Sequence, residues 1–160
     1  MTDEIKFKAV KESKIEMIEI MLPNDANTLG NVFGGRIMSL IDIARGVAAM
    51  RHCRKSVVTA SVGDLHFISP IKIGYMVILE AVVIYTGRTS MEVEVTVWSE
   101  NPITGERKFT SHAHLTYVAL GSDGSHVEVP KVVPETEDEK KRYEDAKKRK
   151  EERIARKSFV

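Results

Sequence analysis

The chain has 160 residues and a mass of 18.0 kDa, which is the size of one domain. Its composition, 42% hydrophobic and 29% charged residues, is ordinary for a globular protein, and no apolar run reaches the roughly 18 residues of a membrane span. The 24 basic and 23 acidic residues leave a net charge of +1, which argues against a globally basic nucleic-acid-binding protein. The first six residues lack a signal-like pattern. A single cysteine, Cys53, can form no intrachain disulfide, so we expect a cytoplasmic protein.

Five segments carry the signature of β-strands. Residues 14–21 partly alternate between apolar and polar side chains, and a loop rich in turn-forming residues follows at 22–31. Longer runs rich in Val, Ile, Thr and aromatic residues lie at about 56–68, 76–86, 90–100 and 106–120. Their connectors are short and contain no helical pattern, which predicts hairpins and a meander and excludes parallel βαβ units. Strict alternation over 91–97 predicts that one face of that strand meets water.

One helix is predicted between the loop and the second strand, from about residue 33 to residue 52. Apolar residues at helical spacing form a stripe along it, and the opposite face is also mostly apolar, so the helix is expected to be buried nearly all round. One sheet cannot cover such a helix completely. The pattern therefore predicts an α+β fold in which a long antiparallel sheet curls around the helix and a second copy of the chain covers the rest.

A carboxylate stands two turns into this apolar helix, at Asp42. Burying an ionised carboxylate is costly unless it has a partner. Arg45, three residues on, could supply that partner in a purely structural ion pair. The functional interpretation is a carboxylate in a crevice that acts as a general base or a nucleophile.

Two short segments have the chemistry to bind an anion. Gly34 and Gly35 begin the helix, where free backbone N–H groups can hold an anion or polarise a carbonyl, although the glycines could also serve only the turn. Arg88, Thr89 and Ser90 follow a glycine in a tight connector, and such side chains can bind phosphate; a plain hairpin is the alternative.

The remaining chemically active residues carry weaker signals. His112 and His114 share one face of the last strand, but no carboxylate or third histidine is near them in sequence, so no metal site is predicted. His66 is a weak candidate for a general base. Cys53 follows two basic residues but lies at the C-terminal end of the helix, where the dipole opposes a thiolate.

The C-terminal segment 135–157 holds ten basic and eight acidic residues. Acidic residues come first and basic residues last, which suits a helix macrodipole, and Thr136 with Glu139 resembles a capping box. We therefore divide the chain into a domain at 1–134 and a charged helical tail at 135–160. The tail is interpreted as a solubilising helix or as a basic arm over a phosphate-bearing ligand or a neighbouring subunit.

A series of motifs in a fixed order resembles the cytosolic acyl-CoA thioesterases of the hotdog fold, in their bacterial form. The motifs are LPNDANTLGNVFGG at 22–35, IMSLID at 37–42, VVTAS at 57–61, FISPIKIG at 67–74, GRTSMEV at 87–93 and TGER at 104–107. The resemblance implies hydrolysis of fatty acyl-CoA to a free acid and coenzyme A, without a cofactor or a metal. It also implies a homo-oligomer, at least a dimer and typically a hexamer built as a trimer of dimers. The near-zero net charge and the lack of a long apolar run predict no nucleic-acid or membrane partner.

The resemblance also assigns roles to residues. It makes Asp42 the catalytic carboxylate and places Asn31 across the dimer interface from the partner's aspartate. Gly34 and Gly35 would hold the thioester oxygen, and Arg88, Thr89 and Ser90 would lie towards the nucleotide end of coenzyme A. Arg45 departs from the small residue that is usual at its position.

Two other functions compete with the thioesterase. A hotdog dehydratase acting on hydroxyacyl thioesters would need a histidine near the active site, but the only histidine of the helix, His52, is at its far end. A module that binds acyl-CoA without catalysis would be favoured if Arg45 neutralised Asp42.

Overall fold

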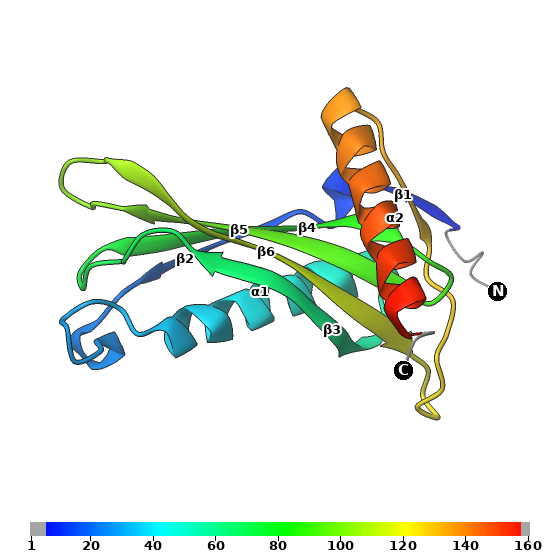
Figure 1. The fold of residues 1–160 in the computed structure, drawn as a ribbon, viewed down its shortest axis with the longest axis horizontal. Coiled ribbons are helices and arrows are strands. Elements are labelled where there is room, and N and C mark those ends of the chain that lie inside the picture. The colour runs from blue at the N-terminus through cyan, green and yellow to red at the C-terminus, as the bar shows by residue number, and fades with distance from the viewer. Residues whose placement is uncertain (1–5, 158–160) are drawn as a thin grey trace.

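A computed structural model describes residues 6–157; residues 1–5, in the segment without a signal-like pattern, and residues 158–160 of the tail lie outside it. The described chain forms a five-stranded antiparallel sheet with a helix on each face (Figure 1). The strands of this sheet are β2 (Ile15–Ile20), β3 (Ser56–Phe67), β4 (Met76–Thr86), β5 (Ser90–Glu100) and β6 (Arg107–Leu120). The helices are α1 (Gly34–Cys53) and α2 (Glu137–Lys157). All seven elements were predicted, so the sequence patterns are confirmed at this level.

Short elements that the sequence did not reveal complete the structure. β1 (Phe7–Ala9) and β7 (Lys131–Val133) form a two-stranded parallel sheet, and single 3₁₀ turns occupy Val10–Glu12 and Pro23–Asp25. Three-residue strands are too short to show a periodic pattern, which explains why they were missed.

The strand order is β2-β4-β5-β6-β3. The meander through β4, β5 and β6 is confirmed, but the predicted hairpin between β3 and β4 is wrong, because β3 pairs with β6 at the far edge. The connector between them bonds elsewhere: the carbonyl of Ile71 accepts the N–H of Val32, and the carbonyl of Tyr75 accepts the N–H of Met21. These bonds draw the connector to the loop before α1 instead of into a tight turn.

The hydrophobic core lies between α1 and the inner face of the sheet. Every second residue of β4, β5 and β6 points towards the helix, and the helix contributes its apolar stripe; the core residues include Ile37, Leu40, Ile41, Ala44, Ala48, Val77, Leu79, Val93, Val95, Ala113 and Leu115. The α+β hotdog arrangement, a long antiparallel sheet around one helix, is thereby confirmed.

The outer face of α1 is not covered within one chain. Met38, Ile43 and Met50 are 49%, 50% and 44% exposed, and the edge strand β3 exposes Val58 and Val62. An apolar band of this kind on a single chain is typical of a surface that another chain covers.

The tail helix α2 crosses the outer face of the sheet (Figure 1). Arg142 of α2 pairs with Glu94 of β5, and Arg149 pairs with Glu92. The rings of Tyr143 and Tyr85 lie 4.9 Å apart. Glu92 and Glu94, beneath α2, are only 4% and 6% exposed. The prediction that one face of residues 91–97 meets water is therefore wrong, because α2 covers it.

The start of α2 has the predicted cap, since the hydroxyl oxygen of Thr136 accepts the N–H of Glu139 at 3.0 Å. Neither interpretation of the tail anticipated that it packs on its own sheet. The division at residues 134 and 135 stays a prediction. Within residues 6–157, neither helix is long and apolar enough to cross a bilayer.

Candidate active site

The loop ahead of α1 is held in a fixed shape by its own polar groups. The side-chain oxygen of Asn27 accepts the N–H groups of Leu29 and Asn31 at 2.9 and 3.1 Å, and the carbonyl of Asn31 accepts the N–H of Asn27 at 2.7 Å. The carbonyl of Asp25 accepts the N–H of Phe33. The predicted site residue Asn31 is half-buried. Its loop owes its conformation to the hydrogen bonds of Asn27.

The helix begins beside an apolar cavity. No side chain caps the first turn of α1, so the N–H groups of Gly34 and Gly35 are available for an anion or a carbonyl oxygen; their role in binding stays a prediction. A Cβ at position 35 would meet the ring of Phe33, so a side chain there would have to displace that ring. A cavity of about 310 Å³ adjoins this turn, and its walls include Gly34, Ile37, Phe67 and Ile71.

Asp42 lies at the rim of the uncovered apolar band. Its side chain is 59% exposed, whereas the side chain of Arg45 is 8% exposed. The Arg45 guanidinium bonds to the Asp42 carboxylate, lies 5.1 Å from the ring centre of Tyr117 and reaches the hydroxyl of Thr59 at 3.4 Å. The Asp42–Arg45 pair that the sequence allowed is therefore present, yet the carboxylate stays accessible.

Tyr117 adds a second contact to the same carboxylate. Its hydroxyl donates to Oδ1 of Asp42 at 3.4 Å, and burial raises the pKa of this phenol, so it remains a hydrogen-bond donor at neutral pH. Arg45 and Tyr117 together fix the direction of the Asp42 side chain.

One chain does not assemble all the predicted residues. Gly34 and Asp42 are separated by eight residues of helix, or about 12 Å along its axis, and no hydrogen bond or ion pair joins Asn31 to Asp42 in the described part of the chain. Arg88 and Thr89 of the β4–β5 connector, and Ser90 at the start of β5, lie at the opposite end of the sheet from Asn31, about 37 Å away along β4. The loop and the connector therefore serve one site only if different subunits contribute them.

The connector itself is well fixed. The carbonyl of Arg88 accepts the N–H of Val129, and the carbonyl of Thr89 accepts the N–H of Ala119. Lys150 of α2 reaches the hydroxyl of Ser90 at 3.4 Å. Lys150 was not singled out as a site residue, because the contact spans 60 residues and depends on how α2 packs.

The weaker candidates lie away from Asp42. Cys53 is buried, and burial raises the pKa of its thiol, so it is no thiolate. His66 is exposed on β3. His112 and His114 lie on the outer face of the sheet, where both contact Glu94. Burial opposes the ionisation of Glu94, but hydrogen bonds with both histidines and the charge of Arg142 hold the pKa of this carboxyl well below its usual range.

The chain and its fold are similar to known proteins. A family model described as the thioesterase superfamily matches residues 29–106. A protein of Bacillus subtilis named as an uncharacterized acyl-CoA thioester hydrolase is 44% identical over 98% of this chain and 90% of its own length. The chain belongs to the thioesterase superfamily. A human relative, named a cytosolic acyl coenzyme A thioester hydrolase, is 38% identical over 88% of this chain. The match covers 37% of the human protein's length.

Solved structures support the same family. This thioesterase-superfamily chain superimposes on an apo-hexameric acyl-CoA thioesterase with a TM-score of 0.92, 42% identity and coverage of 98% and 100% of the two chains. It superimposes on an acyl-CoA hydrolase of Staphylococcus aureus, solved with butyryl coenzyme A and coenzyme A, with a TM-score of 0.88, 36% identity and coverage of 96% and 93%. Variants of the Staphylococcus enzyme have been solved in which alanine replaces an aspartate, an asparagine 15 positions before it, or a threonine 17 positions after it.

Proposed function

We propose that this protein hydrolyses the thioester of fatty acyl-CoA to a free fatty acid and coenzyme A, with Asp42 as the catalytic carboxylate. The observation that carries the proposal is an accessible carboxylate held by Arg45 and Tyr117 in the middle of an otherwise apolar helix. This carboxylate stands in a chain that is 44% identical to an acyl-CoA thioester hydrolase.

The proposed reaction needs only water and the thioester. The oxygen of a water molecule attacks the thioester carbon, the C–S bond breaks, and the proton that the water loses passes to the departing sulfur to give the thiol of coenzyme A. Asp42 acts as a general base on the water or attacks the carbon itself as a nucleophile, and in the second case water then hydrolyses the anhydride. The N–H groups of Gly34 and Gly35 donate to the oxygen that becomes negatively charged.

We assign a positioning role to an asparagine of the loop before α1. Asn31 is the residue that the family resemblance selects, and within residues 6–157 its side-chain amide forms no hydrogen bond that would hold it away from a ligand. If Asp42 corresponds to the aspartate substituted in the Staphylococcus enzyme, the same separations of 15 positions before and 17 positions after it lead to Asn27 and Thr59 in this chain. Thr59 contacts Arg45, and Asn27 supports the backbone of Asn31, so both residues belong to the proposal.

Substrate binding is proposed for the connector between β4 and β5. Arg88 is exposed, and Thr89 and Ser90 add hydroxyl groups beside it, a combination that suits the phosphates at the nucleotide end of coenzyme A. Because this connector lies a strand length from Asn31, we expect each site to use residues from more than one subunit.

The proposed assembly is a homo-oligomer that covers the apolar band on α1 and β3. A dimer is the minimum, and a hexamer built as a trimer of dimers is proposed from the hexameric relative. We place the enzyme in the cytoplasm, which agrees with the unpaired Cys53 and with the cytosolic human relative. No nucleic-acid or membrane partner is proposed.

One observation favours a second candidate function. Arg45 pairs with Asp42, and a neutralised carboxylate would suit a module that binds acyl-CoA without hydrolysing it. A dehydratase is disfavoured, because His52 is fully buried at the end of α1 and contacts the carbonyl of Pro130 at 2.6 Å.

A thiol-release assay on acyl-CoA substrates of increasing chain length separates these functions. The wild type is expected to release thiol, and Asp42→Asn, which keeps the shape of the side chain, is expected to lose about 10²–10⁴-fold in kcat. Circular dichroism and coenzyme A binding of the variant serve as controls for folding. Binding without thiol release by the wild type would support the binding module, and equal turnover by the variant would exclude Asp42 as the catalytic group.

A further inference from the structure

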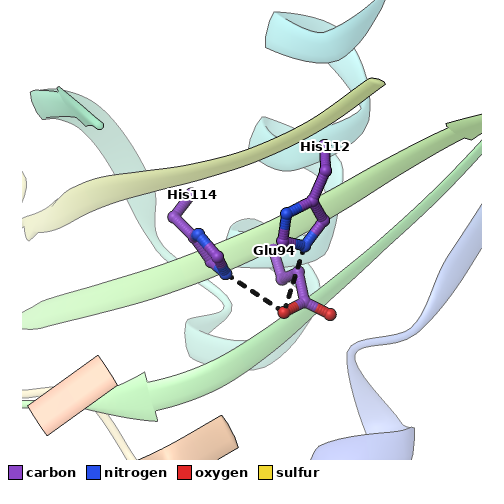
Figure 2. Close-up of side chains that lie close together, drawn as sticks. All are labelled: Glu94, His112 and His114. Atoms are coloured by element: carbon purple, nitrogen blue, oxygen red, sulfur yellow. Dashed lines mark hydrogen bonds and ion pairs between the residues drawn. The ribbon is translucent and has the colours of Figure 1, made fainter. Parts of the chain in front are cut away.

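Three potential metal ligands meet on the face of the sheet opposite α1 (Figure 2). Glu94 lies on β5, and His112 and His114 lie on β6. The strand register places Glu94 directly opposite His114 and Thr96 opposite His112, so the carboxylate sits between the two imidazoles. We call these three residues the outer-face triad.

The spacing of the triad fits a small metal ion. Oε2 of Glu94 is 3.1 Å from Nε2 of His114 and 3.4 Å from Nε2 of His112, and all three ligand atoms lie within 4.8 Å of one another. A tetrahedral zinc ion with ligands at about 2.0–2.1 Å has neighbouring ligands about 3.3–3.4 Å apart. An ion between these three atoms would therefore require only small movements of the side chains.

The chemical identity of the ligands narrows the choice of ion. Two imidazole nitrogens and one carboxylate oxygen are a set that binds first-row transition metals such as zinc, whereas calcium and magnesium prefer oxygen ligands alone. Three protein ligands leave a fourth position for water.

The residues around the triad also orient its ligands, as the neighbours of metal ligands do in metalloproteins. Arg142 of α2 contacts the other oxygen, Oε1, of Glu94, which leaves Oε2 facing the histidines, and such outer partners orient metal-binding carboxylates. The Glu94 side chain is 7% exposed and that of His112 is 38% exposed, so the site is enclosed on one side and reachable on the other. A cavity of about 560 Å³ lies beside Glu94, and its walls include Glu94, Thr96 and Arg142.

We propose that Glu94, His112 and His114 bind one divalent transition-metal ion per chain, and we take zinc as the ion to test. The site is separated from Asp42 by the thickness of the sheet, so its ion takes no part in the proposed hydrolysis. Through Glu94 and Arg142 it connects β5 and β6 to α2, and binding to the folded state alone stabilises that state.

Isothermal titration calorimetry with ZnCl₂ tests the proposal on full-length protein without a histidine tag, after dialysis against a chelator. We expect one ion per chain, a higher melting temperature with zinc, and an affinity at least about tenfold weaker in His112→Asn. His112→Asn is chosen because the side chain is partly exposed, and Glu94→Gln is the second variant. His126→Ala, which changes an exposed histidine outside the triad, is the matched control.

Visible absorption of bound Co²⁺ gives an independent readout of the ligand geometry. A tetrahedral spectrum in the wild type and in His126→Ala, and its loss in both triad variants, would support the site. Zinc binding of equal strength in wild type and His112→Asn, or no saturable binding at one ion per chain, would overturn the proposal. Thiol release should be unchanged by zinc removal, so failure of the metal site and failure of the thioesterase proposal are distinguishable.

Discussion

The docking of α2 includes an ion pair between Arg149 and Glu92 that one substitution can break. Both nitrogens Nε and Nη2 of Arg149 donate to the carboxylate of Glu92 at 3.0 Å. The side chain of Glu92 is 5% exposed and that of Arg149 is 34% exposed. Arg149→Met keeps most of the aliphatic stem but leaves the carboxylate buried without its cation.

The size of the effect follows from these exposures. Removing one partner of a fully buried ion pair costs about 3–5 kcal/mol. Because Arg149 is one-third exposed, water screens the pair and can reach Glu92 when α2 moves, so we expect a cost of about 2 kcal/mol to the docked state. At 1.4 kcal/mol for each factor of ten, this raises the undocked fraction of α2 about 30-fold.

Limited digestion with trypsin measures this fraction, because α2 is rich in lysine and arginine and is cleaved when it opens. The cleavage rate follows the open population when closing is fast, so we expect cleavage within α2 to accelerate about 30-fold in Arg149→Met. Lys148→Met is the matched control, since it also removes one cleavage site but changes an exposed neighbour. A second substitution, Glu92→Leu, should restore slow cleavage to Arg149→Met by removing the unpaired charge. If Arg149→Met is cleaved within twofold of the control rate, the ion pair does not hold α2.

Three further predictions concern the loop, the buried histidine and the apolar band. Asn31→Ala and Asn27→Ala should each lower kcat/KM for thiol release at least about tenfold. If a variant keeps the parental kcat/KM, the substituted residue is not part of the active site. Burial lowers the pKa of His52, so the neutral ring is favoured in the folded state. The stabilisation should therefore be fully present above pH about 6.5 and should fall as the pH drops below that value. Melting temperature measured against pH should fall less steeply in His52→Gln than in the wild type. Ile43→Asp places a charge in the apolar band and should shift the sedimentation profile towards monomer; an unchanged profile would mean that this face is not an interface.

Most of the fold could be predicted from the sequence, because its signals are local. The apolar stripe of α1 and the strand runs rich in Val, Ile, Thr and aromatic residues predicted element bounds to within one or two residues, and the motif series indicated the family. The β3–β4 connection was mispredicted because hydrogen bonds of Ile71 and Tyr75 to distant segments decide its path, and such bonds leave no trace in a periodic pattern.

The candidate site was predicted only in part for a similar reason. Asp42 and Arg45 are one helical turn apart, so their pairing followed from spacing alone. The contacts of Thr59 and Tyr117 with this pair, and the approach of Glu94 to His112 and His114, depend on strand register. Glu94 is 18 residues from His112 in the sequence, which is why no carboxylate was expected beside the two histidines.

Subunit mixing tests most directly whether the loop asparagine and Asp42 of different subunits form one site. Asn31→Ala (or Asn27→Ala, if that is the inactive loop variant) and Asp42→Asn are refolded together in equal amounts, and thiol release is measured. About half of randomly formed dimers are mixed, and each mixed dimer has one of its two sites intact, so about a quarter of the parental activity should return. If mass spectrometry shows mixed oligomers but no activity returns, the two residues do not act together across an interface.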